Sequence, residues 1–440
     1  MVLLRYLTVI VLPFLLVFIP ASSEARSSIA KKVFDKVNPF VFQIKTALSA
    51  DSSKASYGSG FIVSKDGKLI TNYHVISGVL NKDKDYKMYL ISEKESYEAS
   101  VLAIDVINDL ALLKIDKKFK KHLKLARKMP SQGAKVFSIG LPKSLNMSIT
   151  EGNYNGILKN GLYSRVNMSS PLNSGMSGGP TVNASGEVVG VNVSYLLLSQ
   201  NISFSVPVNH VRKLLSKKIT KEKTAKTKDF LHEDIEKQIF SVQQQLMKDL
   251  SKNKNKDLML NNWRVKKPSE LLNCWSDSDK DEEGFYENIS ETCYLDNSIF
   301  LKRGVRSGHY SISYQIFETE VLNNWQLLNL ATWAYNIGSR YAVNFKKKHN
   351  PFLTDYNCAE TRVINDYNIP MLVNYCLRGY TKYSKIFNVD VKFMTLDKNS
   401  SVLTMEAFLR GFSLENIKEF IKKHVDSVRF KNSVSDQSLP

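Results

Sequence analysis

The stretch Asn173–Pro180 reads Asn-Ser-Gly-Met-Ser-Gly-Gly-Pro and places Ser177 among small residues. A serine hydroxyl is a weak nucleophile at neutral pH, so it needs a neighbouring base and backbone N–H groups that stabilise an oxyanion. Gly175 permits a sharp turn, and the N–H groups of Gly175 and Ser177 can supply the oxyanion hole. The stretch therefore indicates acyl-transfer chemistry, provided that a base comes from elsewhere in the chain.

Two other segments offer that base and a carboxylate to orient it. Residues 58–71 predict two apolar strands joined by a turn at Lys65–Gly67, and His74 follows the second strand. Asp109 stands at the start of another apolar strand, with Asp105 as a rival carboxylate four residues earlier. The order His, Asp, Ser at these spacings resembles that of the chymotrypsin fold.

The resemblance is closer to the HtrA (DegP-like) branch of trypsin-like serine proteases, and it covers about Val33 to Val211. Six strings carry it in the family's order: GSGFIVSKDGKLITNYHVI, ASVLAIDVINDLALLKID, KVFSIGLP, SITEGNYNGIL, NSGMSGGPTVNASGEVVGVNV and ISFSVPVN. The resemblance implies a mainly β protease domain of two six-stranded antiparallel β-barrels. It also implies that Ser177 is the nucleophile, that His74 is the general base and then acid, and that Asp109 orients His74.

Three residues depart from the family's pattern without removing a catalytic group. Met176 precedes the serine where the family usually has Asn, Ser174 replaces a common Pro, and Tyr73 stands where Asn or a small residue is usual. We therefore expect an active enzyme.

The resemblance also locates a substrate pocket, the S1 pocket, on either side of the nucleophile in the sequence. No Asp lies there to pair with a substrate Arg or Lys, so trypsin-like cleavage is not expected. Apolar walls favour aliphatic P1 residues with loose selectivity, since each methylene discriminates by only ~1–3 kcal/mol. The residues assigned to this pocket are Pro171, Leu172, Ile202, Ser203 and Phe204.

The N-terminus predicts export. Arg5 precedes an apolar run from Leu7 to Pro20, followed by small residues up to Ala25. This is the pattern of a cleaved signal peptide over residues 1–25, and the run is shorter than the ~20 residues of a spanning helix. A periplasmic or secreted protein is expected, with a retained N-terminal anchor as the alternative.

All four cysteines lie in the second half of the chain, and none lies in the protease region. An even count in an exported chain predicts two disulfides, and of three possible pairings the local one is favoured. Zinc ligands would need short C-x-x-C spacing, which is lacking, so neither a metal nor a cofactor is expected. The favoured pairs are Cys274–Cys293 and Cys358–Cys376.

The length of 440 residues suits two or three domains. We expect a protease domain over residues 27–217, a basic linker and amphipathic helix over 218–260, an α+β domain over 261–430 and a tail over 431–440. Within the protease domain, residues 27–42 form either an oligomer contact or a helix packed on its own barrel. The amphipathic helix follows from apolar residues at steps of three or four: Leu231, Ile235, Ile239, Val242, Leu246 and Leu250.

The C-terminal domain resembles no family that we recognise, and it lacks the carboxylate-binding loop of a PDZ domain. Alternation around Tyr310–Ile316 predicts a strand, and residues 320–345 predict a helix. Residues 389–395 and 401–408 predict a hairpin, and Ser413 is expected to cap a last helix.

The net charge of +19 would favour contact with anionic surfaces, but a solvated basic surface is the favoured explanation of it. Nucleic acid is not expected as a partner, because the chain is predicted to be exported and has no reader motif. Expected partners are protein or peptide substrates, mainly unfolded chains, and further copies of this chain.

Two functions remain open at this point. The first is an exported serine endopeptidase in protein quality control or processing. The second is a latent, protease-fold binding protein that acts like a chaperone through its C-terminal domain.

Overall fold

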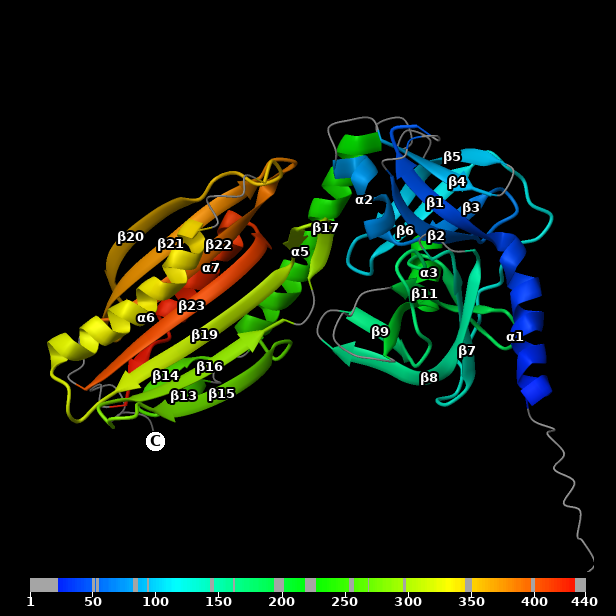
Figure 1. The fold of residues 1–440 in the computed structure, drawn as a ribbon. Coiled ribbons are helices and arrows are strands. Elements are labelled where there is room, and N and C mark those ends of the chain that lie inside the picture. Colours follow the sequence, from blue (N-terminus) through cyan, green and yellow to red (C-terminus); the bar gives the residue numbers. More distant parts are fainter. Residues whose placement is uncertain are drawn as a thin grey trace, which may run out of the picture.

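The structure is a computed structural model. It describes residues 23–431 apart from residues 50, 51, 53, 54, 82–85, 93–94, 143–145, 161–162, 194–201, 218–226, 253–256, 268, 296–297, 345–349 and 397–399. Two β-barrels lie at one end of the molecule and a large twisted sheet at the other, with a long helix between them (Figure 1).

The first half of the chain folds into two closed barrels of six antiparallel strands each, which confirms the predicted fold. The first barrel has, in order around its wall, β1 (Val41–Ala47), β2 (Ser56–Ile62), β3 (Lys68–Thr71), β6 (Leu110–Ile115), β5 (Ser96–Asp105) and β4 (Lys87–Ile91). The second has β10 (Pro180–Asn183), β11 (Val188–Val193), β12 (Ser203–Pro207), β9 (Tyr163–Met168), β8 (Ser148–Asn160) and β7 (Lys135–Gly140).

The predicted turn between β2 and β3 depends on Gly67. Its φ is 86°, and a Cβ there would lie 2.5 Å from the carbonyl oxygen of Lys117, so only glycine fits. The turn aligns β2 and β3 antiparallel, with Phe61 opposite Ile70. This hairpin fixes the position at which the chain leaves β3 and reaches His74.

In the part of the chain that the structure describes, three helices and one short 3-10 turn accompany the barrels. They are α1 (Ser23–Val37), η1 (Asn38–Phe40), α2 (Tyr73–Asn81) and α3 (Val208–Leu215). Val33 and Val37 of α1 are buried in the same cluster as Phe137 and Val182 of the second barrel. This helix therefore packs on its own barrels, the second of the two arrangements considered for residues 27–42.

The predicted signal peptide falls mainly on residues 1–22, which lie outside the described part of the chain. Among the residues that the structure describes, no helix combines the length and the apolar character needed to span a bilayer.

The amphipathic helix predicted after the protease region is α5 (Thr227–Lys252), and it joins the two halves of the molecule. The six apolar residues on which its prediction rested, from Leu231 to Leu250 at steps of three or four, are buried. On the barrel side, Gln238 accepts from the N–H of Val106 at 2.8 Å. On the other side, Glu236 accepts from the N–H of Lys385 at 3.0 Å, so one helix is anchored to both halves.

The C-terminal half is built on a seven-stranded antiparallel sheet, consistent with the α+β prediction. Its order is β15 (Asn273–Lys280), β16 (Glu287–Tyr294), β19 (His309–Glu318), β23 (Ser401–Phe412), β22 (Tyr383–Thr395), β21 (Pro370–Tyr380) and β20 (Asn357–Ile364). Smaller sheets are formed by β13 (Asp257–Leu260), β14 (Trp263–Lys266) and β24 (Arg429–Phe430), and by β17 (Ile299–Lys302) and β18 (Val305–Ser307).

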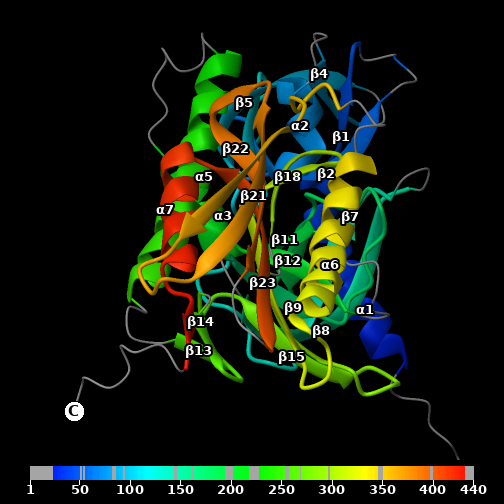
Figure 2. The ribbon, with the colours of Figure 1, turned by 90° about the vertical axis from the view of Figure 1, so that its left-hand side faces the viewer.

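Helices cover both faces of the large sheet. In Figure 2, α6 (Asn324–Asn344) lies on one face, while α5 and α7 (Leu414–Val425) lie on the other. The predicted cap of α7 is present, since the side chain of Ser413 accepts from the N–H of Asn416. At the start of α6, the side chains of Asn323 and Gln326 each accept a hydrogen bond from the other residue's backbone N–H at 3.0 Å. This cap explains why the helix begins at Asn324 and not at residue 320, where it was predicted to begin.

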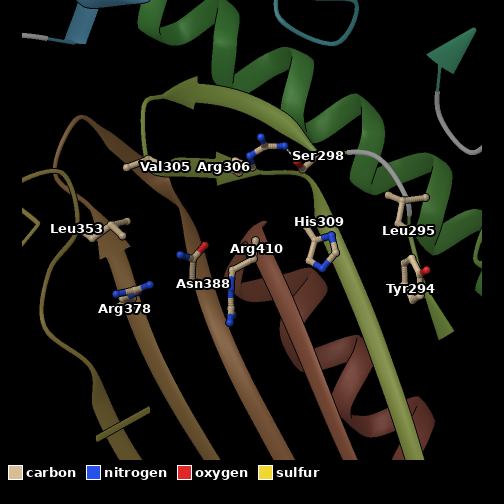
Figure 3. Close-up of a pocket in the computed structure, with 11 residues that line it drawn as sticks. Tyr294, Leu295, Ser298, Val305, Arg306, His309, Leu353, Arg378, Asn388 and Arg410 are labelled. Atoms are coloured by element: carbon tan, nitrogen blue, oxygen red, sulfur yellow. Dashed lines mark hydrogen bonds between the residues drawn. The ribbon is translucent and has the colours of Figure 1, made fainter. Parts of the chain in front are cut away.

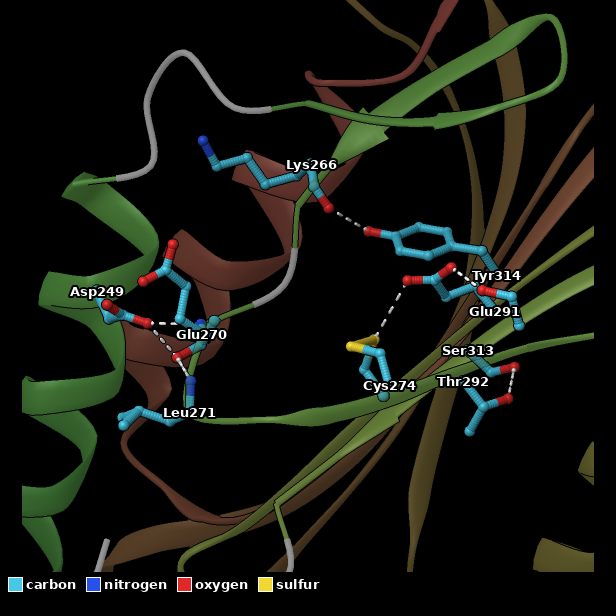
Figure 4. Close-up of a disulfide and its surroundings, with 12 residues drawn as sticks. Asp249, Lys266, Glu270, Leu271, Cys274, Glu291, Thr292, Ser313 and Tyr314 are labelled. Carbon is cyan, nitrogen blue, oxygen red and sulfur yellow. Dashed lines mark hydrogen bonds between the residues drawn. A yellow bond between two sulfur atoms is a disulfide. The ribbon is translucent and has the colours of Figure 1, made fainter. Parts of the chain in front are cut away.

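Both predicted disulfides are present, and each joins an edge strand of the large sheet to its neighbour. Cys274 of β15 lies directly opposite Cys293 of β16, and Cys358 of β20 lies directly opposite Cys376 of β21. Figure 4 shows the first of these with Glu291 beside it. In the chain-entropy view, each disulfide contributes about 3 kcal/mol to stability, because it closes a loop in the unfolded chain.

Candidate active site

The three residues proposed as a triad come from both barrels. His74 lies in the first turn of α2, directly after β3, and Asp109 lies in the turn between β5 and β6. Ser177 lies in the loop between β9 and β10 of the second barrel and is almost fully buried. The backbone N–H of Ser59 in β2 donates to the carbonyl oxygen of Ser177 at 2.7 Å, which joins the serine loop to the first barrel.

The structure brings His74 and Asp109 together. Nδ1 of His74 lies 2.6 Å from one carboxylate oxygen of Asp109, and the backbone N–H of His74 donates to the other oxygen at 2.9 Å. Asp109 has a φ of 62°, and its carbonyl oxygen accepts from the side chain of Asn72 at 2.8 Å. The aspartate is therefore held by several bonds in a backbone conformation that non-glycine residues rarely adopt.

The rival carboxylate Asp105 has a different role. It accepts from the backbone N–H of Asn108 at 3.0 Å and from the side-chain amide of Asn108 at 2.8 Å. Both of its oxygens are used to shape the turn that presents Asp109. The geometry thus favours Asp109 as the partner of His74.

The charge of Asp109 acts on the protonation of His74. Burial lowers the pKa of His74, while the charge of Asp109 and its hydrogen bond raise it, and the net result is a pKa above the usual value of 6.5. The pair can therefore stabilise an imidazolium, which is the species that forms when a histidine takes a proton from a serine.

The serine loop is shaped by two glycines and anchored by side chains from other strands. Gly175 has a φ of 100° and Gly178 a φ of 86°. The hydroxyl of Ser59 donates to the carbonyl oxygen of Gly175 at 2.8 Å, and the N–H of Gly178 donates to the carbonyl oxygen of Asn192 at 2.9 Å. Oxyanion stabilisation by the N–H groups of Gly175 and Ser177 stays a prediction.

Ser59 and Asn192 are supporting residues that the sequence analysis did not identify. The Ser59 hydroxyl also accepts from the N–H of Leu141 at 2.9 Å, and the Asn192 amide donates to the carbonyl oxygen of Ile139 at 3.1 Å. The one available signal for Ser59 is its place between two glycines of β2. Asn192 gave no signal, because a single polar residue in a strand is usually solvent-facing.

Two of the departures from the family pattern are buried. Met176 is fully buried, and a Cβ at Gly140 would lie 2.8 Å from its Cα. Tyr73 is also fully buried, and its hydroxyl donates to the carbonyl oxygen of Leu301 at 3.2 Å. Leu301 belongs to β17, so Tyr73 attaches the start of α2 to the C-terminal half.

The same hairpin, β17–β18, reaches the candidate catalytic histidine. The ring of Phe300 meets the ring of His74 edge to face, with centroids 6.0 Å apart. No sequence signal indicated this contact, because the two residues are far apart in the chain and Phe300 lies in a segment of unrecognised family. The C-terminal half thus contacts the candidate active site.

The residues assigned to the S1 pocket lie on two segments near the serine loop. Ser203 and Phe204 belong to β12 and pair with Met168 and Asn167 of β9. Pro171 and Ile202 are exposed, and Leu172 is half-buried. The assignment stays a prediction, and residues 194–201, which precede β12, lie outside the described residues.

The described residues contain one cluster of possible metal ligands, formed by Cys274, Glu291 and Cys293. Its two cysteines are bonded to each other, so no thiolate is available to bind a metal there.

Comparison with known proteins gives the following matches. Residues 58–191 match the family model described as a trypsin-like peptidase domain. Serine protease HTRA1 of Xenopus tropicalis is 31% identical over 219 residues, which cover 47% of this chain and 46% of that protein. A probable periplasmic serine endoprotease, DegP-like, of Pseudomonas fluorescens is 36% identical over 162 residues, which cover 35% of this chain and 33% of that protein.

The crystal structure of the active form of the Rv3671c protease from M. tuberculosis is 22% identical, with a TM-score of 0.40. The match covers 44% of this chain and 88% of the chain in that crystal structure. The match to this chain spans less than half the length of either curated relative.

Proposed function

We propose that the protein is a serine endopeptidase. The premise is that residues 58–191 of this chain form a trypsin-like peptidase domain similar to HtrA and DegP-like serine proteases. The observation that carries the proposal is the 2.6 Å contact between His74 Nδ1 and Asp109. The loop that holds Ser177 is joined to the first barrel by the hydrogen bond from the N–H of Ser59. That arrangement supports acyl transfer from a peptide bond to Ser177.

The proposed mechanism has two halves. In acylation, Oγ of Ser177 attacks the scissile carbonyl while Nε2 of His74 takes the hydroxyl proton and then gives it to the leaving amine. In deacylation, a water replaces the amine and the same proton transfers run again. Asp109 holds the imidazole through Nδ1–H and stabilises the imidazolium, and the N–H groups of Gly175 and Ser177 stabilise the oxyanion.

We propose loose specificity for aliphatic P1 residues. None of the five residues assigned to the pocket is charged. Without a carboxylate, a substrate Arg or Lys would lose hydration with no ion pair in return. We further propose an exported protein that acts on unfolded chains. The two disulfides suit an oxidising compartment, and the DegP-like relative is named as periplasmic.

Fluorophosphonate labelling tests the proposed enzyme directly. We expect the wild-type chain to be labelled in the presence of unfolded casein, and labelling to disappear in Ser177→Ala. Ser174→Ala is the matched control, because Ser174 is an exposed serine of the same loop, and it should be labelled like the wild type. Absence of labelling in the wild type, with or without casein, would instead support the binding-protein alternative.

The pH dependence of kcat/KM is expected to report His74. Only neutral His74 can accept the serine proton, so activity should fall as pH drops through the raised pKa of His74. The midpoint of this acid limb should lie above 6.5, the usual histidine value. In Asp109→Asn the limb should move to lower pH, because the charge that raises the pKa is gone. An acid limb at the same pH in both proteins would contradict the assignment.

A further inference from the structure

A pocket separate from the candidate active site lies in the C-terminal half, between the end of the large sheet and the β17–β18 hairpin (Figure 3). Its volume is about 580 Å³, within the range of roughly 300–1,000 Å³ that is common for small-molecule sites. Eleven of the residues that the structure describes line it; none of these eleven is acidic, and three are arginines: Arg306, Arg378 and Arg410.

The register of the sheet gathers the polar wall of this pocket into one row. His309 of β19 lies opposite Arg410 of β23, Arg410 lies opposite Asn388 of β22, and Asn388 lies opposite Arg378 of β21. Residues directly opposite one another in antiparallel strands project from the same face, about 5 Å apart. Four polar side chains therefore stand side by side across four neighbouring strands.

This row lies on the face of the sheet away from α5 and α7. The neighbouring residue Tyr310 projects from the other face, where its ring contacts Phe420 of α7 with centroids 5.2 Å apart. At the far end of the sheet α6 covers the face that carries the row, through a cluster that includes Phe317 and Met394. The row itself faces the pocket and not a hydrophobic core.

The arginines are held in place by different contacts. Arg410 donates through Nη1 to the carboxylate of Asp390 and to the carbonyl oxygen of Val389. The guanidinium of Arg378 lies 4.3 Å from the ring centroid of Tyr356, and its Nε is buried without a hydrogen-bond partner among the described residues. A buried, unsatisfied donor in a cationic pocket is the feature that a bound anion would relieve.

Arg306 completes the cationic wall from the opposite side. It belongs to β18, is exposed, and donates through Nη1 to the hydroxyl of Ser298 at 2.9 Å. The local positive potential acts on His309: burial lowers the pKa of this histidine, and the charges of Arg410 and Arg306 lower it further. His309 therefore stays neutral near pH 7 and can act as a hydrogen-bond partner.

The pocket lining also includes three apolar side chains, those of Leu295, Val305 and Leu353. Guanidinium groups suit carboxylate and phosphate oxygens, which they bind through paired N–H donors. We propose that this pocket is a binding site for a small organic anion, in which a carboxylate or phosphate is attached to an apolar group. The anion would lie between Arg378 and Arg410 on the sheet and Arg306 on the hairpin.

Isothermal titration of the full-length chain tests this site without any need for proteolytic activity. The probes are 3-phenylpropionate and phenyl phosphate, with neutral 3-phenylpropanamide and inorganic phosphate as comparisons. We expect at least one of the two aromatic anions to bind with a Kd on the order of 1 mM. The neutral amide and inorganic phosphate should bind at least about tenfold more weakly. Whichever of the two aromatic anions binds more tightly identifies the preferred head group.

Two variants assign that binding to the pocket. Arg378→Gln and Arg306→Gln should each weaken it by about tenfold or more, since each removes charge-assisted hydrogen bonds. Arg362→Gln, at an exposed arginine of β20 outside the pocket, should bind like the wild type. Arg306 is exposed, so its variant tests the site even if Arg378→Gln fails to fold. Binding that neither variant weakens, equal binding of the neutral amide, or binding of neither aromatic anion would overturn the proposal.

Discussion

Replacing Asp109 by asparagine is expected to lower kcat by about ten-thousandfold while the fold is retained. The asparagine can keep the hydrogen bond to the backbone N–H of His74, which now measures 2.9 Å. Its uncharged amide no longer stabilises the imidazolium, and it allows the imidazole to adopt the wrong tautomer. The measurement is kcat on a casein or peptide substrate, with circular dichroism as the check on folding.

Asp105→Asn is the matched control for that experiment. Asp105 lies four residues away and bonds to Asn108, not to His74, so its loss should weaken the turn and leave kcat within about tenfold of the wild type. If Asp105→Asn were the variant with the larger loss of kcat, the triad assignment would be wrong. The pair of variants thus separates orientation of the histidine from stability of the turn.

Gly178→Ala is expected to destabilise the protease domain by roughly 2–5 kcal/mol and to abolish activity. A Cβ at Gly178 would lie 2.2 Å from the backbone oxygen of Ser59 and 2.3 Å from Oγ1 of Thr71, and the φ of 86° is unfavourable for alanine. Because Ser59 also holds the serine loop, the clash would displace the residues next to the nucleophile. Thermal unfolding and fluorophosphonate labelling would measure the two effects.

Gly133→Ala isolates the steric part of this effect. Gly133 has the same φ of 86°, but a Cβ there would meet nothing within 4 Å. It should therefore cost only the backbone strain of about 1–2 kcal/mol and leave labelling intact. Equal losses of stability in the two variants would show that the contact with Ser59 is not what requires glycine at position 178.

The parts of the molecule that could be predicted from the sequence are those set by short-range patterns. The Lys65–Gly67 turn, the amphipathic spacing of α5 and the Ser413 cap each depend on residues close together in the chain. The barrels and the pairing of His74 with Asp109 followed from six ordered strings that resemble one family. The disulfides followed from favouring the shortest loops among three pairings.

The remaining features depend on register between distant segments. The row of Arg378, Asn388 and Arg410 exists because β21, β22 and β23 align at those residues, and a shift of one residue would turn the side chains to the other face. Likewise, the contact between Phe300 and His74 depends on how two halves of the chain pack. Local sequence patterns do not specify either relation.

The large sheet has two edges, and each is tied to the strand beside it by a covalent bond. β15 and β20 are the outermost strands, and their side chains are almost all exposed. A free edge strand can peel off and let a strand from another chain take its place. Here an edge strand that detaches stays tethered at Cys274 or Cys358, at a high effective concentration relative to its partner, so it re-pairs before an intruding strand can compete. A protein whose proposed substrates are unfolded, strand-forming chains would thereby be guarded against exchanging its own edge strands for theirs.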